Sequence, residues 1–154
     1  MTDMRGLYDE IILDHNKNPR NVKVVDPATN SAEGNNPLCG DALMLTIRRE
    51  GDVIADIGIR FPHDKKGCAI STASASLMTG AVKGKTVQEA EQLFEAFHEM
   101  ITAPDTTPVD TARLGKLAAL AGARRFASRA KCASLAWHTL HAALQNRQAP
   151  VTTE

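Results

Sequence analysis

The sequence predicts an α+β fold in which an antiparallel sheet of about three strands packs against a layer of helices. Two segments of the first half, 42–49 and 53–61, alternate apolar and polar side chains with the period of a β-strand. Beyond Gly67, the apolar residues recur at helical spacing almost to the end of the chain. Strands that come first and helices that follow are typical of this fold class.

The first predicted element is a helix at 4–16. Its apolar residues fall at helical spacing, and Pro19 ends it. We expect Tyr8 on this helix to pack in the core. Residues 20–38 are polar and rich in turn-forming residues, so they predict at most one irregular strand.

The two alternating segments predict an antiparallel hairpin, because Glu50-Gly51-Asp52 stands between them as a turn. One face of the hairpin should lie on the core. The residues expected on that face are Leu43, Leu45, Ile47, Val53, Ala55, Ile57, Ile59 and Phe61.

The second half of the chain predicts helices at 69–82, 87–101, 112–121 and 129–146. Thr86 and Glu89 fit a capping box at the start of the second of these helices. The composition of 102–111 indicates a loop. Since no repeat or second domain is visible, we expect one domain over 1–146 and a flexible tail over 147–154.

Composition argues against several classes of function. The 18 Lys and Arg residues balance 18 Asp and Glu residues, so no basic surface for nucleic acid or an anionic membrane is indicated. The first ten residues, MTDMRGLYDE, are too charged for a signal peptide. No apolar run approaches the roughly 20 residues of a membrane span. We therefore expect a cytoplasmic protein that binds neither nucleic acid nor membranes.

The residues best suited to catalysis or metal binding are the three cysteines, Cys39, Cys68 and Cys132. An odd number in a cytoplasmic chain argues against a disulfide framework, which leaves inert core thiols, reactive thiols or metal ligands. Each cysteine lies at the end of a predicted element: Cys39 before a strand, Cys68 before a helix, and Cys132 in the first turn of the last helix. Free N–H groups at a helix start stabilise a thiolate, which favours a chemical role.

A shared zinc site is one hypothesis for these thiols, because zinc prefers thiolate ligands and is usually four-coordinate. Asp41 is the candidate for the fourth position. It lies two residues after Cys39, on the same side of an extended chain, with Gly40 between them to let the backbone bend. Arg129, three residues before Cys132, is a candidate for neutralising the charge of the site.

The histidines do not show ligand spacing. His138 and His141 point away from the apolar face of the last helix and are expected in solvent, as is His98. His15 and His63 lie near predicted loops. No histidine is convincingly placed as the base of a cysteine hydrolase.

Four motifs in order resemble the IscU/NifU-type iron–sulfur cluster assembly family, and its SufU branch most closely. They are LYDEIILDHNKNPRN (7–21), NPLCGD (36–41), GCAISTASASLM (67–78) and RAKCASLAW (129–137). The resemblance spans nearly the whole chain. It implies an IscU/NifU-like fold and a metal site made of Cys39, Asp41, Cys68 and Cys132.

Three differences from the scaffold-type IscU members favour the SufU branch. Those members carry a histidine just before the third cysteine, where this chain has Lys131. They also carry a Leu-Pro-Pro-Val-Lys segment, where this chain has FASRAK (126–131). The segment between Cys68 and Cys132 is longer here than in the scaffold branch.

Resemblance to the SufU branch implies a zinc-dependent sulfurtransferase. Such a protein accepts persulfide sulfur from a SufS-type cysteine desulfurase, here on Cys39, and passes it to a downstream iron–sulfur assembly scaffold. The first alternative is a scaffold that holds a transient [2Fe–2S] cluster, or iron, on the same ligands. A structural zinc module is the second alternative.

Overall fold

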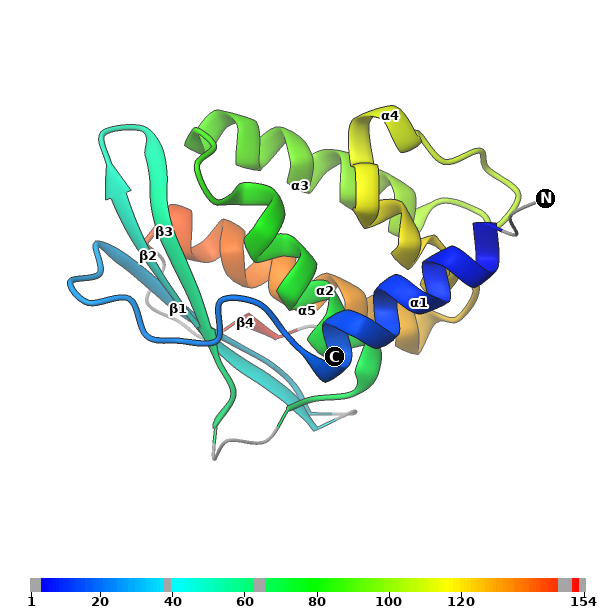
Figure 1. Ribbon diagram of the computed structural model, residues 1–154, viewed down its shortest axis with the longest axis horizontal. Coiled ribbons are helices and arrows are strands. Elements are labelled where there is room, and N and C mark those ends of the chain that lie inside the picture. The colour runs from blue at the N-terminus through cyan, green and yellow to red at the C-terminus, as the bar shows by residue number, and fades with distance from the viewer. Residues whose placement is uncertain (1–3, 38–39, 63–65, 147–150, 153–154) are drawn as a thin grey trace.

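The computed structural model describes residues 4–37, 40–62, 66–146 and 151–152. Its strands form one sheet in the order β3-β2-β1-β4. Their bounds are β1 (Asn30–Asn36), β2 (Asp41–Glu50), β3 (Val53–Arg60) and β4 (Val151–Thr152). The first three strands are antiparallel neighbours, with helices packed against the sheet (Figure 1). The predicted α+β class is therefore confirmed.

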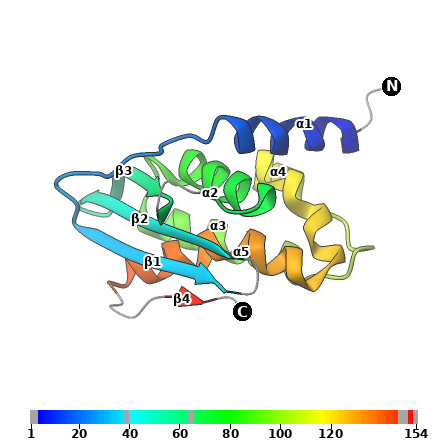
Figure 2. The ribbon, with the colours of Figure 1, turned by 90° about the horizontal axis from the view of Figure 1, so that it is seen from below.

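Two layers of helices cover the sheet. The long helices are α1 (Met4–Lys17), α2 (Ala69–Val82), α3 (Val87–Thr102) and α5 (Ala127–Leu144), all within two residues of the predicted bounds. Helices α2 and α5 contact the strands, whereas α1 packs on α2 and α3 packs on α5 (Figure 2). The stacked rings of Phe97 and Trp137, with centroids 4.9 Å apart, join α3 to α5. Tyr8 packs against this core and is partly buried, as expected.

The capping box before α3 is present as predicted. Thr86 accepts the N–H of Glu89 on its hydroxyl, and the Glu89 carboxylate accepts the N–H of Thr86. Two N–H groups at the helix start are satisfied in this way, so local chemistry determines where α3 begins.

The hairpin of β2 and β3 is also confirmed, and Gly51 adopts φ +62° in its turn. The prediction of which β3 side chains face the core is wrong at the start of the strand, where Ile54 is buried and Val53 is 38% exposed. A register irregularity causes the difference: Arg48 is opposite Asp56 and Arg49 is opposite Ile54, so Ala55 is an extra residue in β3 that reverses which side chains face the core.

The polar strand β1 is regular, although its sequence predicted at most an irregular strand. It pairs with β2 from Asn30 opposite Ile47 to Asn36 opposite Asp41. Gly34 lies against α5 so closely that a side chain there would collide with the hydroxyl of Thr139. Pairing and close packing, rather than intrinsic β-propensity, account for this strand.

The helix predicted at 112–121 is replaced by two shorter elements. A single α-helical turn, α4 (Thr111–Leu114), is followed by the 3₁₀ segment η2 (Gly115–Arg125). Gly115 has φ +57°, which a continuing α-helix cannot accommodate. The apolar residues of η2 nevertheless pack into the core. The helical periodicity therefore predicted correctly that this segment is buried, but not that it is a 3₁₀ helix.

Two residues of the predicted tail lie within the described part of the chain. Val151 and Thr152 pair in parallel with Gly34 and Asn35 as β4, because the outer edge of β1 offers free backbone groups.

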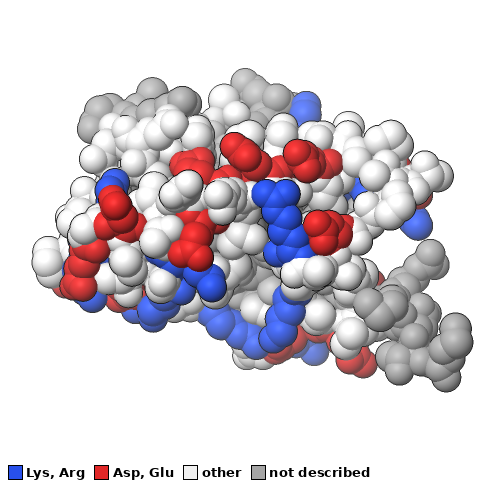
Figure 3. All heavy atoms as spheres, turned by 90° about the horizontal axis from the view of Figure 1, so that it is seen from above, with Lys and Arg blue, Asp and Glu red and all other residues white. Residues whose placement is uncertain are grey.

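No helix in the described part of the chain is long and apolar enough to cross a membrane. On the face over α3 and α4, acidic and basic side chains are interspersed (Figure 3), in keeping with a formal net charge of zero.

Candidate metal centre

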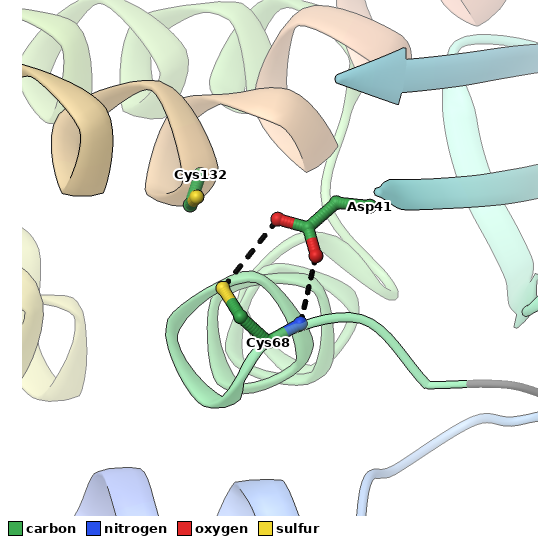
Figure 4. Close-up of side chains that lie close together, drawn as sticks. All are labelled: Asp41, Cys68 and Cys132. Carbon is green, nitrogen blue, oxygen red and sulfur yellow. Dashed lines mark hydrogen bonds between the residues drawn. The ribbon is translucent and has the colours of Figure 1, made fainter. Parts of the chain in front are cut away.

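Asp41 and Cys68 stand at the starts of two elements and are bonded to each other. Asp41 opens β2 directly after Gly40, which has φ +71°. Its carboxylate is buried, with only 1% of the residue exposed. Oδ1 accepts the backbone N–H of Cys68 at 2.7 Å, and Oδ2 accepts the thiol of Cys68 at 3.4 Å (Figure 4). A single carboxylate therefore joins the start of β2 to the start of α2.

Cys68 is the N-cap residue of α2. Its Sγ accepts the N–H of Ser71 at 3.4 Å, and its carbonyl oxygen accepts the N–H of Thr72 at 3.0 Å. A sulfur atom thus takes the role that a serine or aspartate oxygen usually has at this position. The predicted placement of Cys68 at a helix start is confirmed.

Gly67 provides the space in which the carboxylate lies. A Cβ at this position would be 2.5 Å from Oδ1 of Asp41 and 3.1 Å from its Cγ. Any larger residue would push the carboxylate away from Cys68. Sequence reasoning does not identify Gly67 or Ser71 as part of the site; a glycine directly before a capping cysteine is the signal that marks such an arrangement.

Cys132 completes the group from the opposite side. It projects from α5 beside the other two side chains and is buried (Figure 4). Asp41, Cys68 and Cys132 each offer one ligand atom, and these atoms lie within 4.8 Å of one another. Since α5 begins at Ala127, Cys132 lies in its second turn, not in the first as predicted. The helix dipole acts mainly within the first turn, so it stabilises a thiolate at Cys68 more than at Cys132.

The pKa of the Cys68 thiol is raised, first because the thiol is partly buried and also because the Asp41 carboxylate lies beside it. The N–H of Ser71 and a hydrogen bond from Cys132 act in the opposite direction. On balance these effects favour the protonated form of the Cys68 thiol. A positive charge among these three donors is what would favour its deprotonation.

The remaining predicted site residues are placed as follows. Cys39 lies outside the described residues. Asn36 and Asp41, which stand on either side of it in the sequence, pair with each other across β1 and β2. Arg129 is exposed, with its guanidinium over the ring of Phe126 at 4.7 Å. Within the described part of the chain, no ion pair joins Arg129 to Asp41.

The histidines lie apart from this group. His15 is buried and its Nδ1 bonds the hydroxyl of Ser76 at 2.6 Å. His98 is exposed, as predicted. The prediction for His138 and His141 is wrong: both are half-buried, because they pack against the ring of Phe94. His63 lies outside the described residues.

The sequence matches a known family over most of its length. The family model described as the NifU-like N terminal domain covers residues 7–133, which include Asp41, Cys68 and Cys132. The chain belongs to this family. A NifU-like domain was the expectation from the four motifs, and it is confirmed.

Relatives of this NifU-like domain have two kinds of name. The zinc-dependent sulfurtransferase SufU of Bacillus subtilis is 40% identical over 134 residues, which cover 87% of this chain and 86% of the relative. The iron–sulfur cluster assembly scaffold protein IscU of Streptococcus pyogenes is 37% identical over 145 residues, which cover 94% of this chain and 87% of the relative.

Solved structures agree with the fold. The SufU crystal structure from Fervidobacterium islandicum aligns with a TM-score of 0.79 at 31% identity, and the alignment covers 92% of this chain and 99% of that one. A NifU-like protein of Brucella abortus aligns with a TM-score of 0.79 at 20% identity over 95% of this chain and 99% of that one, which supports the fold alone.

Proposed function

We propose that this NifU-like domain is a zinc-dependent sulfurtransferase of iron–sulfur cluster biogenesis. It accepts persulfide sulfur on Cys39 from a SufS-type cysteine desulfurase and passes it to a downstream assembly scaffold. The observation that carries the proposal is the group of Asp41, Cys68 and Cys132, whose ligand atoms lie within 4.8 Å of one another. The likeness to a relative named a zinc-dependent sulfurtransferase supports it.

The donors of this group fit zinc in number, kind and spacing. Two thiols and one carboxylate are common zinc ligands, and Zn–S bonds of about 2.3 Å in a tetrahedron separate two sulfur atoms by about 3.8 Å. The ligand atoms of Asp41, Cys68 and Cys132 lie within 4.8 Å of one another, so a small movement of the side chains would bring the two sulfur atoms to this separation. Cys39, two residues before Asp41, is the proposed fourth ligand. Bound zinc would keep the thiols deprotonated near neutral pH.

Sulfur transfer to this chain is a thiol–persulfide exchange. The thiolate of Cys39 attacks the outer sulfur of the desulfurase persulfide and forms a new S–S bond. The original S–S bond breaks, and the desulfurase cysteine leaves as a thiolate. No oxidant or reductant is consumed, because one persulfide replaces another. During this step Cys68, Cys132 and Asp41 hold the site together without Cys39.

The deciding experiment combines the full protein with a SufS-type desulfurase, cysteine and a reductant. The protein should accelerate cysteine turnover in this mixture, and mass spectrometry of a sample prepared without the reductant should find one added sulfur on Cys39. The variant Cys39→Ala should retain weak zinc binding through the other three ligands but give no acceleration. Ser31→Ala, at the opposite end of β1 from the site, is the control. Full acceleration by Cys39→Ala would overturn the role of Cys39 as acceptor.

A scaffold for a [2Fe–2S] cluster or iron is the second candidate. It is favoured by the IscU relative, which matches 94% of this chain. The same four residues would be its ligands. Metal analysis and the visible spectrum of protein purified without oxygen separate the two functions. A colourless protein with zinc supports sulfur transfer, whereas a brown protein with iron and sulfide supports the scaffold. If zinc removal unfolds the domain and the desulfurase is unaffected, zinc is purely structural.

A further inference from the structure

Helices α2 and α5 carry the two described thiols of the candidate metal centre and pack against each other. Cys68 caps the start of α2, and Cys132 projects from α5 beside it (Figure 4). The spacing of the two sulfur atoms therefore depends on how the two helices are held together.

A buried hydrogen bond joins the two helices next to Cys132. The hydroxyl of Ser74 on α2 donates to the carbonyl oxygen of Ala133 on α5 at 2.6 Å. This length is at the short end of the range for hydrogen bonds between oxygen atoms. Both residues are fully buried, so water has no access to take the place of either partner. Within an α-helix a carbonyl also accepts the N–H four residues further on, so Ser74 uses the second lone pair of this oxygen.

This hydrogen bond connects the main chain beside one thiol to the helix that begins at the other. Ala133 follows Cys132 directly, and Ser74 lies on α2 roughly 9 Å along the helix axis from Cys68. Asp41 is tied to the same helix, because its carboxylate accepts the backbone N–H of Cys68. Helix α2 therefore links the other two donors of the centre, one through its first N–H and one through the hydroxyl of Ser74.

We propose that Ser74 is a positioning residue of the metal centre, because its hydroxyl fixes the place from which Cys132 approaches an ion held by Cys68 and Asp41. A serine or threonine inside a helix often bonds a carbonyl of its own preceding turn. Thr79 of α2 does so with the carbonyl of residue 76, whereas Ser74 reaches across to α5. The inference rests on the proposed function, since it concerns the ligands of the same zinc site.

The test compares Ser74→Ala with Ser76→Ala in the full protein. Ser76 is an equally buried serine on the same helix, but its hydroxyl bonds Nδ1 of His15 on α1 at 2.6 Å. Each variant loses a buried hydrogen bond between helices, so both should lower Tm. Zinc affinity is measured by competition with a chromophoric chelator. It should fall about tenfold or more in Ser74→Ala alone, which is the usual effect of removing a group that orients metal ligands.

Cobalt(II) provides a readout that a loss of stability alone does not move. When Co²⁺ is bound in place of zinc, the position and intensity of its visible absorption bands depend on the geometry of the ligands. These bands should change in Ser74→Ala and stay the same in Ser76→Ala. Ser74→Thr keeps the hydroxyl and adds a methyl group to a packed interface, so it should lose stability but retain the cobalt spectrum.

Three results would overturn the role of Ser74 and leave the metal centre intact. The first is a zinc affinity and a cobalt spectrum that are unchanged in Ser74→Ala. The second is an equal loss of zinc affinity in Ser76→Ala, which would reflect stability and not position. The third is a cobalt spectrum that changes in Ser74→Thr as much as in Ser74→Ala. An unaltered protein that binds neither zinc nor cobalt would overturn the proposed zinc site itself, and the role of Ser74 with it.

Discussion

Replacing Gly67 by alanine should break the contact between Asp41 and Cys68. The new Cβ would lie 2.5 Å from Oδ1 of Asp41. Because Asp41 is buried, its carboxylate can move only by losing the 2.7 Å hydrogen bond from the N–H of Cys68. A hydrogen bond to a charged group contributes about 1.5–3 kcal/mol. We therefore expect the free energy of unfolding of the metal-free protein to fall by about 2 kcal/mol, which lowers Tm by roughly 4–8 °C in a domain of this size.

Zinc affinity should fall as well, by roughly 10–100-fold, which is the usual effect of disturbing a group that orients metal ligands. Thermal unfolding followed by circular dichroism and zinc competition with a chromophoric chelator measure the two effects. Gly80→Ala in α2 is the matched control, because no atom lies within 4 Å of its added Cβ. That control should gain about 0.5–1 kcal/mol of stability from better helix propensity and bind zinc normally. Unchanged Tm and zinc affinity in Gly67→Ala would refute the reasoning.

Three further predictions concern stability. Thr86→Ala removes the capping box of α3 and should cost about 1 kcal/mol in urea unfolding, whereas Thr86→Ser should cost little. Gly34→Ala forces a side chain against Thr139 and should cost about 1–3 kcal/mol, part of which Thr139→Ala should restore; equal losses in the single and double variants would contradict the contact. Burial lowers the pKa of His138 in the folded protein, so the unfolded chain binds more protons as pH falls below about 6.5. Stability of the metal-free protein should therefore decrease with falling pH there, and less steeply in His138→Gln; identical pH profiles would argue against this origin.

Features set by adjacent residues could be predicted from the sequence. The hairpin follows from period-2 alternation around Gly51, and the start of α3 follows from Thr86 and Glu89. Both depend on interactions between near neighbours, so a short window contains all the information. The motifs around the cysteines predicted the family for a similar reason, since each motif lies within a short window of the sequence.

Features set by distant contacts could not be predicted. Strand β1 has no β-branched residue, and it exists because β2 pairs with it and Gly34 fits against α5. The 3₁₀ segment η2 has an apolar periodicity that does not distinguish it from an α-helix. His138 lies off the apolar face of its own helix, yet Phe94 of α3 covers it.

The candidate site falls between these cases. Spacing placed Cys68 at a helix start and suggested that Asp41 joins it, and the structure brings both together with Cys132. Residue type alone could not show that the backbone N–H of Cys68 binds Asp41, or that Gly67 makes room for the carboxylate, because those contacts span 27 residues of sequence.

The bond between Asp41 and the N–H of Cys68 has a consequence for the entropy of metal capture. It fixes two donors from distant parts of the chain next to each other before any ion arrives. The conformational freedom that such a pair would otherwise lose on binding is already lost when the domain folds. At the proposed metal site, an incoming ion would therefore meet a preorganised pair of donors, and its capture would require little rearrangement of the surrounding fold.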